Sequence, residues 1–258
     1  MSGAKEWFDA AGALLDKVAS TQLDAVEEAS RYCADAIGGG GLVHLFGTGH
    51  SHIPVEEMFP RYGSYPGFHP IVELSMTFHT QVVGANGQRQ AMFIERVPGL
   101  AHAILANFNF ALPDAFMVFS VSGINAVPVE MAMGARERGL KVIAVTSVTQ
   151  SLQTPTTHIS RTRLLDHADV VLDLCTPSGD ALVTVDDLEG PVGPGSTFVA
   201  VALVNALKTR TAQLLVERDA PPTVITSASV SGKHASARSF DDAYAEHARR
   251  VQRVLRCD

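Results

Sequence analysis

Two short loops carry side chains that can bind a phosphate group. The first is Gly47-Thr-Gly49-His50-Ser51, and the second is Ser120-Val-Ser122-Gly123-Ile-Asn125. Glycine lets each backbone turn tightly and approach a ligand, while hydroxyl and amide groups can donate hydrogen bonds to an anion. A helix that begins directly after such a loop adds free backbone N–H groups and the positive end of its dipole. The two loops therefore predict an anion site, and phosphate is the usual anion.

Other chemistry for these residues fits the sequence less well. Gly47-x-Gly49 begins like a dinucleotide fingerprint, but no third glycine or acidic strand end follows at the required spacing. His50-Ser-His52 is typical of some metal sites, yet the later strand ends offer Ser, Thr and Asn instead of further ligands. The second loop, VSVSG, is not the GxSxG turn of a serine hydrolase. We expect no cofactor and no metal. One plain alternative stays open, in which the two histidines and the serine turns only cap helices.

The elements that must position these loops are strands alternating with helices. An apolar strand at 42–46 precedes the first loop, and a helix at 51–59 follows it. A strand at 115–119 and a helix at 127–138 flank the second loop in the same way. This alternation predicts an α/β fold with a doubly wound parallel sheet, whose ligand lies beyond the carboxyl ends of the strands. We expect further strands at 71–76, 141–145 and 170–174, and further helices at 4–37, 101–108, 160–167, 195–217 and 241–255.

Composition excludes several classes of function. The chain has 258 residues, of which 46% are hydrophobic and 18% charged, so it is not disordered. Its formal net charge of −7 argues against nucleic acid or an anionic membrane as partner. Three scattered cysteines form no zinc motif and suit a reducing compartment. No signal peptide precedes Trp7, and the apolar run 198–207 is too short to span a bilayer, so we expect a cytoplasmic protein.

The order GTGHS, SVSG and then a strand ending in Thr146-Ser resembles the sugar isomerase (SIS) domain, which binds phosphosugars. The resemblance covers roughly residues 35 to 215. It implies phosphate-binding hydroxyls at Ser51, Ser120 and Ser122, whereas the usual threonine at the end of the second loop is Asn125 here. The uncharacterised bacterial branch of these phosphosugar-binding proteins is similar, since it has a long N-terminal helix and a PP-x-V-x-x-S-A-x-x-x-G segment, matched at 221–232. We expect one domain over 1–258, with an N-terminal helical extension at 1–37 and a C-terminal loop and helix at 218–258. The resemblance implies that the site is built by Gly47, Gly49, His50, Ser51, Ser120, Ser122, Gly123, Asn125 and Thr146.

Catalytic residues are implied by a second resemblance within the same family. The N-acetylmuramic acid 6-phosphate etherase uses two glutamates, and Glu57-Met-Phe-Pro-Arg-Tyr-Gly63 and Glu95 are similar in position to the segments that carry them. This implies an acid/base pair of Glu57 and Glu95, with Glu56 as the substitute if the alignment is one residue off. The predicted function is a lyase that removes water across C2–C3 of an amino-sugar 6-phosphate such as N-acetylglucosamine 6-phosphate. An aldose–ketose isomerase and a non-catalytic phosphosugar sensor are the alternatives; the chain lacks the basic helix-turn-helix segment of most such sensors.

Assembly is the last expectation from sequence. The N-terminal helix and the helix at 195–217 offer more apolar surface than one small sheet can cover. Because proteins of the SIS family complete their sites across a dimer, the resemblance implies a homodimer or a higher homo-oligomer. His234, in the loop Ser231-Gly-Lys-His234, is then expected to approach the pocket of a neighbouring copy.

Overall fold

A parallel sheet of five strands forms the centre of the protein. The computed structural model describes residues 2–77 and 87–255. Within these ranges the sheet has the order β2 (Phe68–Ile71), β1 (Val43–Gly47), β3 (Ala115–Phe119), β4 (Lys141–Thr146) and β5 (Val170–Asp173). Strand order reverses between β1 and β3, which pair directly with Gly47 opposite Phe119. Both predicted loops therefore leave the sheet side by side, at the switch point where such sheets bind ligands.

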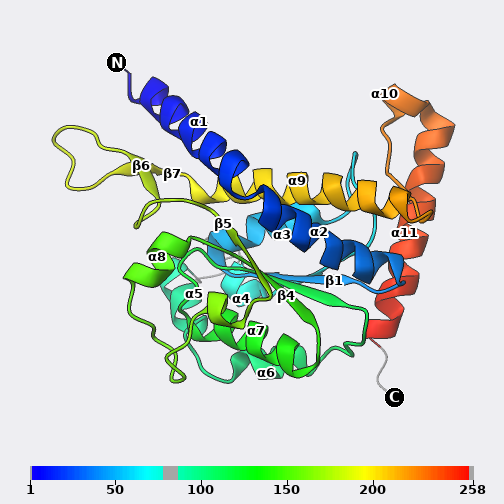
Figure 1. Ribbon diagram of the computed structural model, residues 1–258, viewed down its shortest axis with the longest axis horizontal. Helices are drawn as coiled ribbons and strands as arrows, with labels where there is room; N and C mark the ends of the chain where they lie inside the picture. Colours follow the sequence, from blue (N-terminus) through cyan, green and yellow to red (C-terminus); the bar gives the residue numbers. More distant parts are fainter. Residues whose placement is uncertain (1, 78–86, 256–258) are drawn as a thin grey trace.

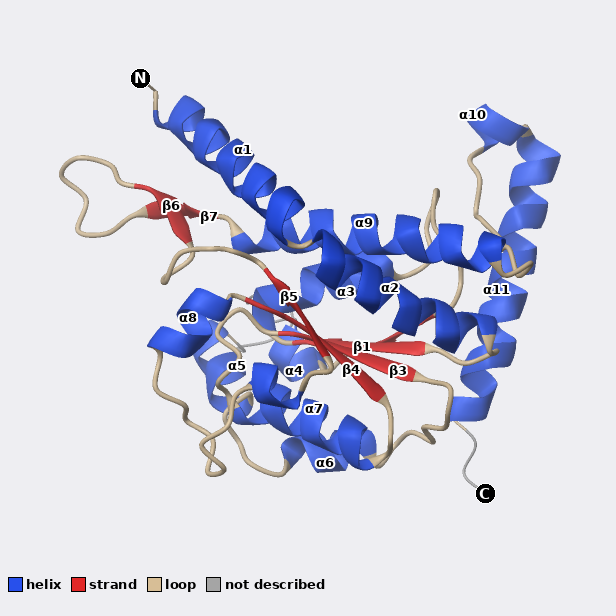
Figure 2. Ribbon diagram, in the orientation of Figure 1, coloured by secondary structure: helices blue, strands red, loops and turns tan. Residues whose placement is uncertain are grey.

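Helices cover both faces of the sheet, as Figures 1 and 2 show. On one face lie α1 (Gly3–Thr21), α2 (Leu23–Gly38), α3 (Ile53–Met58) and α9 (Ser196–Glu217). On the other face lie α6 (Leu100–Leu105) and α7 (Ala126–Glu137). Alternate residues of β3 serve the two cores, since Met117 and Phe119 join one cluster and Phe116 and Val118 the other. Burial on both faces explains why these strands read as continuous apolar runs.

The remaining elements connect or extend this core. Short helices follow three of the strands: the 3₁₀ turn η1 (Gly49–His52) after β1, α4 (Leu74–Thr77) after β2 and α8 (Val148–Gln153) after β4. In Figure 1, α1 and the β6–β7 hairpin extend from one side of the body, and α10 and α11 lie on the other side. The other bounds are α5 (Gln88–Ile94), η2 (Leu164–His167), β6 (Ala181–Val183), β7 (Val192–Pro194), α10 (Ala228–Ser231) and α11 (Lys233–Val254).

The doubly wound parallel sheet and the long N-terminal helix are confirmed, but several predicted elements differ. The strand expected at 71–76 lies at Phe68–Ile71, and a helical turn follows it at Leu74. The helix expected at 160–167 is a loop that ends in a single 3₁₀ turn. The last helix begins at Lys233, eight residues before the predicted start at 241. Sequence reasoning did not predict α5, α8 or the β6–β7 hairpin.

Helix α9 is longer than the apolar run seen in the sequence. By length and composition alone its 22 residues can cross a bilayer, although half of its most apolar stretch is buried inside the protein. Val199, Leu203 and Leu207 belong to the core cluster that α9 shares with α2 and the sheet. A buried core helix of a globular domain passes the same test, so this finding is weak evidence for a membrane span.

Candidate functional site

A cavity of about 330 Å³ lies beyond the carboxyl ends of β1 and β3. The two predicted loops form part of its wall, and helices α5 and α8 supply the rest. Its described lining contains no lysine or arginine, so its polar groups are hydroxyls, amides, the His50 imidazole and one carboxylate. The lining residues are Thr48, Gly49, His50, Ser51, Gln88, Ala91, Met92, Glu95, Ser120, Val121, Ser122, Asn125 and Gln150.

The first loop folds back on itself after β1. A side chain at Gly47 would collide with the carbonyl of Ser51, so glycine is required there by the turn and not by a ligand. The Ser51 N–H donates to the Thr48 carbonyl oxygen at 3.0 Å, which corrects the expectation that this N–H is free for an anion. Ser51 lines the cavity, and its hydroxyl has no protein partner among the described residues. The loop thus offers a side-chain hydroxyl rather than a helix N-terminus.

The second loop is held by its own hydrogen bonds. The Ser120 Oγ accepts the Gly123 N–H at 3.2 Å, and its hydroxyl proton remains available to a ligand. Gly123 has a φ of +61°, a left-handed conformation that favours glycine. Thr146 is fully buried and donates to the Val121 carbonyl oxygen at 3.1 Å. Gly47, Gly123 and Thr146 therefore shape the loops and do not line the cavity, whereas the Ser122 hydroxyl lines it without a protein partner in the described structure.

Glu95 is the one carboxylate in the described wall of this cavity. Its Oε2 accepts the Thr48 hydroxyl at 2.7 Å, and its Oε1 accepts the Asn125 amide at 2.7 Å. Burial raises the pKa of Glu95 above its ordinary value, although the bond from Thr48 and the charge of Arg96 act in the opposite direction. A carboxyl group with a raised pKa can hold or release a proton closer to neutral pH, as acid/base catalysis requires.

Asn125 differs from the role that the resemblance implied. It was expected to contact phosphate from the end of the second loop, yet its amide donates to Glu95. It still lines the cavity, where it fixes one oxygen of the carboxylate. Thr48 fixes the other oxygen from the first loop. Thr48 stands inside the GTGHS motif, so its place beside the site could have been noticed. No local pattern indicates that it contacts a residue 47 positions away.

Glu57 and Glu56 do not line the cavity, which corrects their predicted position. The Glu57 carboxylate accepts hydrogen bonds from Arg61 at 2.7 Å and Asn205 at 3.2 Å. Burial acts to raise its pKa, but these two bonds and the charge of Lys208 together hold the pKa below the ordinary value. The turn at Gly49–His52 is 3₁₀ and α3 begins only at Ile53, and Glu57 on α3 contacts Asn205 of α9. Glu56 is exposed.

Of the two histidines predicted at the site, His50 lines the cavity, as expected, and His234 does not. His234 lies in the first turn of α11, is exposed, and is not a lining residue of its own chain's cavity. Figure 1 places α11 at the side of the molecule away from α5 and α8. Within residues 2–77 and 87–255, no three His, Cys, Asp or Glu side chains are grouped to hold a metal ion.

Sequence reasoning missed Gln88, Met92 and Gln150, which come from the unpredicted helices α5 and α8. Gln150 is informative because its Oε1 atom is buried and has no hydrogen-bond partner among the described residues. An unpaired buried acceptor costs free energy unless a ligand or water donates to it. Gln150 lines the cavity, but this oxygen is itself buried and does not open onto it in the structure as it stands.

Comparison with known proteins identifies the family of this chain. Residues 6–147, more than half of the chain, match the SIS domain family. A UPF0309 protein from Streptomyces coelicolor is 38% identical over 233 residues, which cover 90% of each chain. Another from Geobacillus kaustophilus is 31% identical over 241 residues, covering 93% of this chain and 94% of that protein. The chain is a SIS-domain protein of the UPF0309 family.

Solved structures show that this SIS-domain protein shares its fold with more distant relatives. A phosphoheptose isomerase from Francisella tularensis superposes with a TM-score of 0.53 at 15% identity, covering 83% of this chain and all of that one. A phosphoheptose isomerase from Neisseria gonorrhoeae gives a TM-score of 0.50 at 14% identity, covering 80% of this chain and 95% of that one. At these identities the likeness establishes the fold alone.

Proposed function

We propose that the cavity binds a sugar phosphate and that Glu95 transfers a proton on the bound sugar. The observation that carries this proposal is the convergence of three serine hydroxyls from two loops with one buried carboxylate in a single cavity. Ser51, Ser120 and Ser122 are the phosphate ligands in this proposal. The SIS domain match and the phosphoheptose isomerases of similar fold support it.

The sugar itself would occupy the part of the cavity near Gln150 and Glu95. A sugar hydroxyl, or the N–H of an N-acetylated amino sugar, would satisfy the Gln150 oxygen once the side chain turns this buried atom toward the cavity. Glu95, with its raised pKa, would then act on the carbon beside the carbonyl group. An N-acetylamino-sugar 6-phosphate such as N-acetylglucosamine 6-phosphate supplies the phosphate, the hydroxyls and the amide together.

For a sugar phosphate that carries a hydroxyl at C2, aldose–ketose isomerisation is the reaction that this geometry supports best. Isomerisation needs one base that moves a proton between C1 and C2, and Glu95 is the single carboxylate in the described lining. An N-acetylamino sugar has nitrogen at C2 and cannot form a ketose, so on that sugar the same base would exchange the C2 proton, invert C2 or start an elimination. Elimination of water, the reaction predicted from sequence, needs a second group to protonate the departing hydroxyl. Glu57 does not line the cavity, so His50 is the lining residue that would have to serve. Elimination is therefore the second candidate, and the likeness to the etherase stays a prediction.

The test is incubation with hexose and amino-sugar 6-phosphates in deuterated water, followed by mass spectrometry. Deuterium gain without loss of mass marks isomerisation, and loss of one water marks elimination. Glu95→Gln is expected to lower turnover by about 10²- to 10⁴-fold while sugar-phosphate affinity stays within a few-fold. Glu57→Gln is the matched control and is expected to keep turnover. Tight binding of a sugar phosphate with no exchange at any position would identify a sensor instead.

A further inference from the structure

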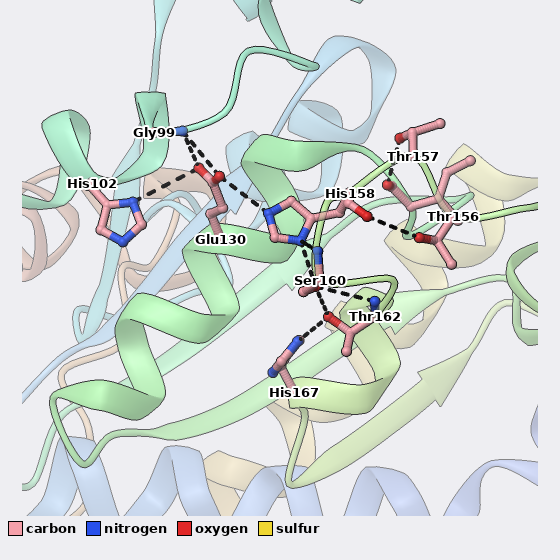
Figure 3. A network of polar contacts seen from close by, with 10 residues as sticks. Gly99, His102, Glu130, Thr156, Thr157, His158, Ser160, Thr162 and His167 are labelled. Carbon is pink, nitrogen blue, oxygen red and sulfur yellow. Dashed lines mark hydrogen bonds and ion pairs between the residues drawn. The ribbon is translucent and has the colours of Figure 1, made fainter.

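A second buried glutamate lies on helix α7, outside the cavity lining. Glu130 is 5% exposed, and most residues around it on α7 are also buried. A buried carboxylate is costly unless hydrogen bonds satisfy it. Both Glu130 oxygens accept the Gly99 N–H, at 3.0 and 2.8 Å, and Oε1 lies 3.3 Å from His158 Nε2 (Figure 3). The carboxylate thus joins two segments that are 59 residues apart in the chain, at Gly99 and His158.

The direction of the hydrogen bond from His158 follows from its other ring nitrogen. The backbone N–H of Ser160 donates to His158 Nδ1 at 3.3 Å, so Nδ1 carries a lone pair. A neutral ring then has its proton on Nε2, which faces Glu130. Ser160 Oγ also lies 2.6 Å from His158 Nδ1, and this contact fixes the orientation of the ring (Figure 3). The same Ser160 oxygen is 2.6 Å from Thr162 Oγ1. His158 is therefore held as a donor to the Glu130 carboxylate.

Gly99 is the end of a short segment that begins at Glu95. Three successive contacts tie this segment to the first turns of α7. The Asn125 amide donates to the Glu95 carboxylate at 2.7 Å, the Val127 N–H donates to the Glu95 carbonyl oxygen at 3.0 Å, and Glu130 accepts from Gly99. Glu95 is thus fixed at its side chain, at its main chain and, through Glu130, four residues further on.

The His158 side of the network reaches the second serine loop. The hydroxyl of Thr157, the residue before His158, donates to the Ile124 carbonyl oxygen at 2.9 Å. The Leu164 N–H donates to the Gly123 carbonyl oxygen at 2.8 Å. The segment 157–164 therefore supports the loop that carries Ser120 and Ser122, and Glu130 connects this segment to the one that carries Glu95.

We propose that Glu130 and His158 are positioning residues that fix the 95–99 segment against α7 and so hold the Glu95 carboxylate at the cavity wall beside the second serine loop. The catalytic part of this inference rests on the proposed function, whereas the placement of Glu95 does not. A misplacement of about 1 Å at a catalytic group can lower a rate by on the order of 10²-fold. Loss of the contact would also admit water to Glu95, whose pKa burial now raises. Arg96 is the charged group that acts on the Glu95 pKa, and His50 is the other ionisable side chain in the described lining of the cavity.

Glutamine cannot replace Glu130 without a cost. A glutamine oxygen at the Oε1 position can accept from both Gly99 and His158, but the amide then takes the Oε2 position, where it faces the Gly99 N–H and two donors meet. Glu130→Gln therefore weakens the contact with Gly99 with almost no change in volume. Glu137→Gln is the matched control, because Glu137 lies on the same helix, is exposed and carries the same charge.

His158→Phe is the second variant, and it tests the loss of the hydrogen bond to Glu130 without the loss of the Glu130 charge. It removes the donor to Glu130 but leaves the Glu130 carboxylate and the overall size of the ring. If Glu130→Gln does not fold, His158→Phe alone carries the test. Titration of the Glu95 carboxyl by ¹³C NMR, assigned with Glu95→Gln, measures its pKa without any substrate.

The expected result is a decrease of the Glu95 pKa toward its ordinary value in Glu130→Gln and in His158→Phe, with no change in Glu137→Gln. A decrease in Glu130→Gln alone would indicate lost charge repulsion and overturn the positioning role. With N-acetylglucosamine 6-phosphate as the probe, the rate of deuterium exchange at C2 at saturating sugar is expected to decrease about 10-fold or more, while the sugar concentration for half-maximal rate changes less. An unchanged Glu95 titration in both variants would overturn the inference. Absence of turnover in the unsubstituted protein would contradict the proposed catalysis but leave the NMR result decisive for positioning.

Discussion

At the scale of single residues, Ser122 is the hydroxyl that a phosphate group can engage most freely. It lines the cavity and has no protein partner among the described residues, whereas Ser120 already accepts the Gly123 N–H. Replacing Ser122 by alanine should therefore remove a ligand contact without disturbing the loop. Replacing Ser120 would change the loop itself.

We predict that Ser122→Ala weakens binding of N-acetylglucosamine 6-phosphate about ten-fold or more. One hydrogen bond contributes on the order of 1 kcal/mol, and more when the acceptor is a charged phosphate. Isothermal titration calorimetry measures the change, with the exposed Ser20→Ala as the control variant. Equal affinity of the unsubstituted protein for N-acetylglucosamine and its 6-phosphate would contradict the proposed phosphate site.

Glu95 is predicted to reduce stability at neutral pH. Because burial raises its pKa, the folded protein binds this proton more tightly than the unfolded chain. The stabilising contribution of the protonated group is complete below the unfolded pKa of about 4.3 and is lost as pH rises through the higher folded pKa. Glutamine at this position stays neutral and can still pair with Thr48 and Asn125. In urea unfolding, Glu95→Gln should gain stability relative to the unsubstituted protein as pH rises from 4 to 7.

The exposed Glu56→Gln is the control for this measurement and should show no such trend. A difference between Glu95→Gln and the unsubstituted protein that does not change with pH would contradict the raised pKa. Together with the expected loss of turnover, a gain in stability would indicate that the carboxylate is kept for function and not for folding.

The residues of the two loops could be predicted because their types and order are local features of the sequence. Ser51, Ser120 and Ser122 do line one cavity. The predicted position of Glu57 was wrong, because its carboxylate contacts Arg61 and Asn205 and does not line the cavity, and sequence spacing does not reveal such a contact with a distant helix. A catalytic role for Glu57 stays a prediction. The role of Asn125 as a partner of Glu95 depends on a contact between distant segments, which one sequence does not reveal.

At the scale of elements, the N-terminus of α9 is capped by a residue from another segment. The Asp180 carboxylate accepts the backbone N–H groups of Gly195 at 3.2 Å and Ser196 at 2.7 Å, and also the Ser196 hydroxyl at 2.5 Å. A carboxylate at this end of a helix satisfies free donors and interacts favourably with the helix dipole. Asp180 therefore fixes the start of the longest core helix.

We predict that Asp180→Ala lowers the free energy of unfolding by about 1–2 kcal/mol, the usual range for loss of a capping side chain. Asp186→Ala, in the exposed part of the same hairpin, is the control and should change stability little. Chemical denaturation followed by circular dichroism compares the two variants. Equal stability of Asp180→Ala and Asp186→Ala would show that water replaces the cap without cost.

Strands that are buried on both faces were predicted well. Segments whose side chains hydrogen-bond to the nearby backbone were not. The strand at 115–119 was found with its observed bounds because its five residues are all apolar and all buried. The helix predicted at 160–167 fails because polar side chains there bond the nearby backbone: Ser160 N–H donates to His158 Nδ1, and Thr162 N–H donates to Ser160 Oγ. Such local bonds compete with the hydrogen bonds of a helix.

At the scale of the whole molecule, α1 leaves an apolar side chain uncovered. Figure 1 shows α1 extending from the body beside the β6–β7 hairpin. Its inner face packs on the core through Ala11, Leu14 and Val18. Phe8, on the same helix, is 70% exposed, and Leu23 at the start of α2 is 68% exposed. Large exposed apolar side chains of this kind favour contact with a partner, and a second copy of the chain is the partner that we propose.

We predict that the protein is at least a homodimer at micromolar concentration and that Phe8→Asp shifts it toward the monomer, because a charge would then have to be buried in the interface. Val230→Asp is the matched control, since Val230 is 83% exposed on α10 at the opposite side of the molecule. Multi-angle light scattering gives the mass of each variant. A monomeric unsubstituted protein would contradict the prediction, and dissociation by Val230→Asp alone would place the interface at α10 and α11. The role proposed for His234 depends on this outcome: it lies outside the cavity of its own chain, so only a neighbouring copy can bring it to a bound sugar phosphate.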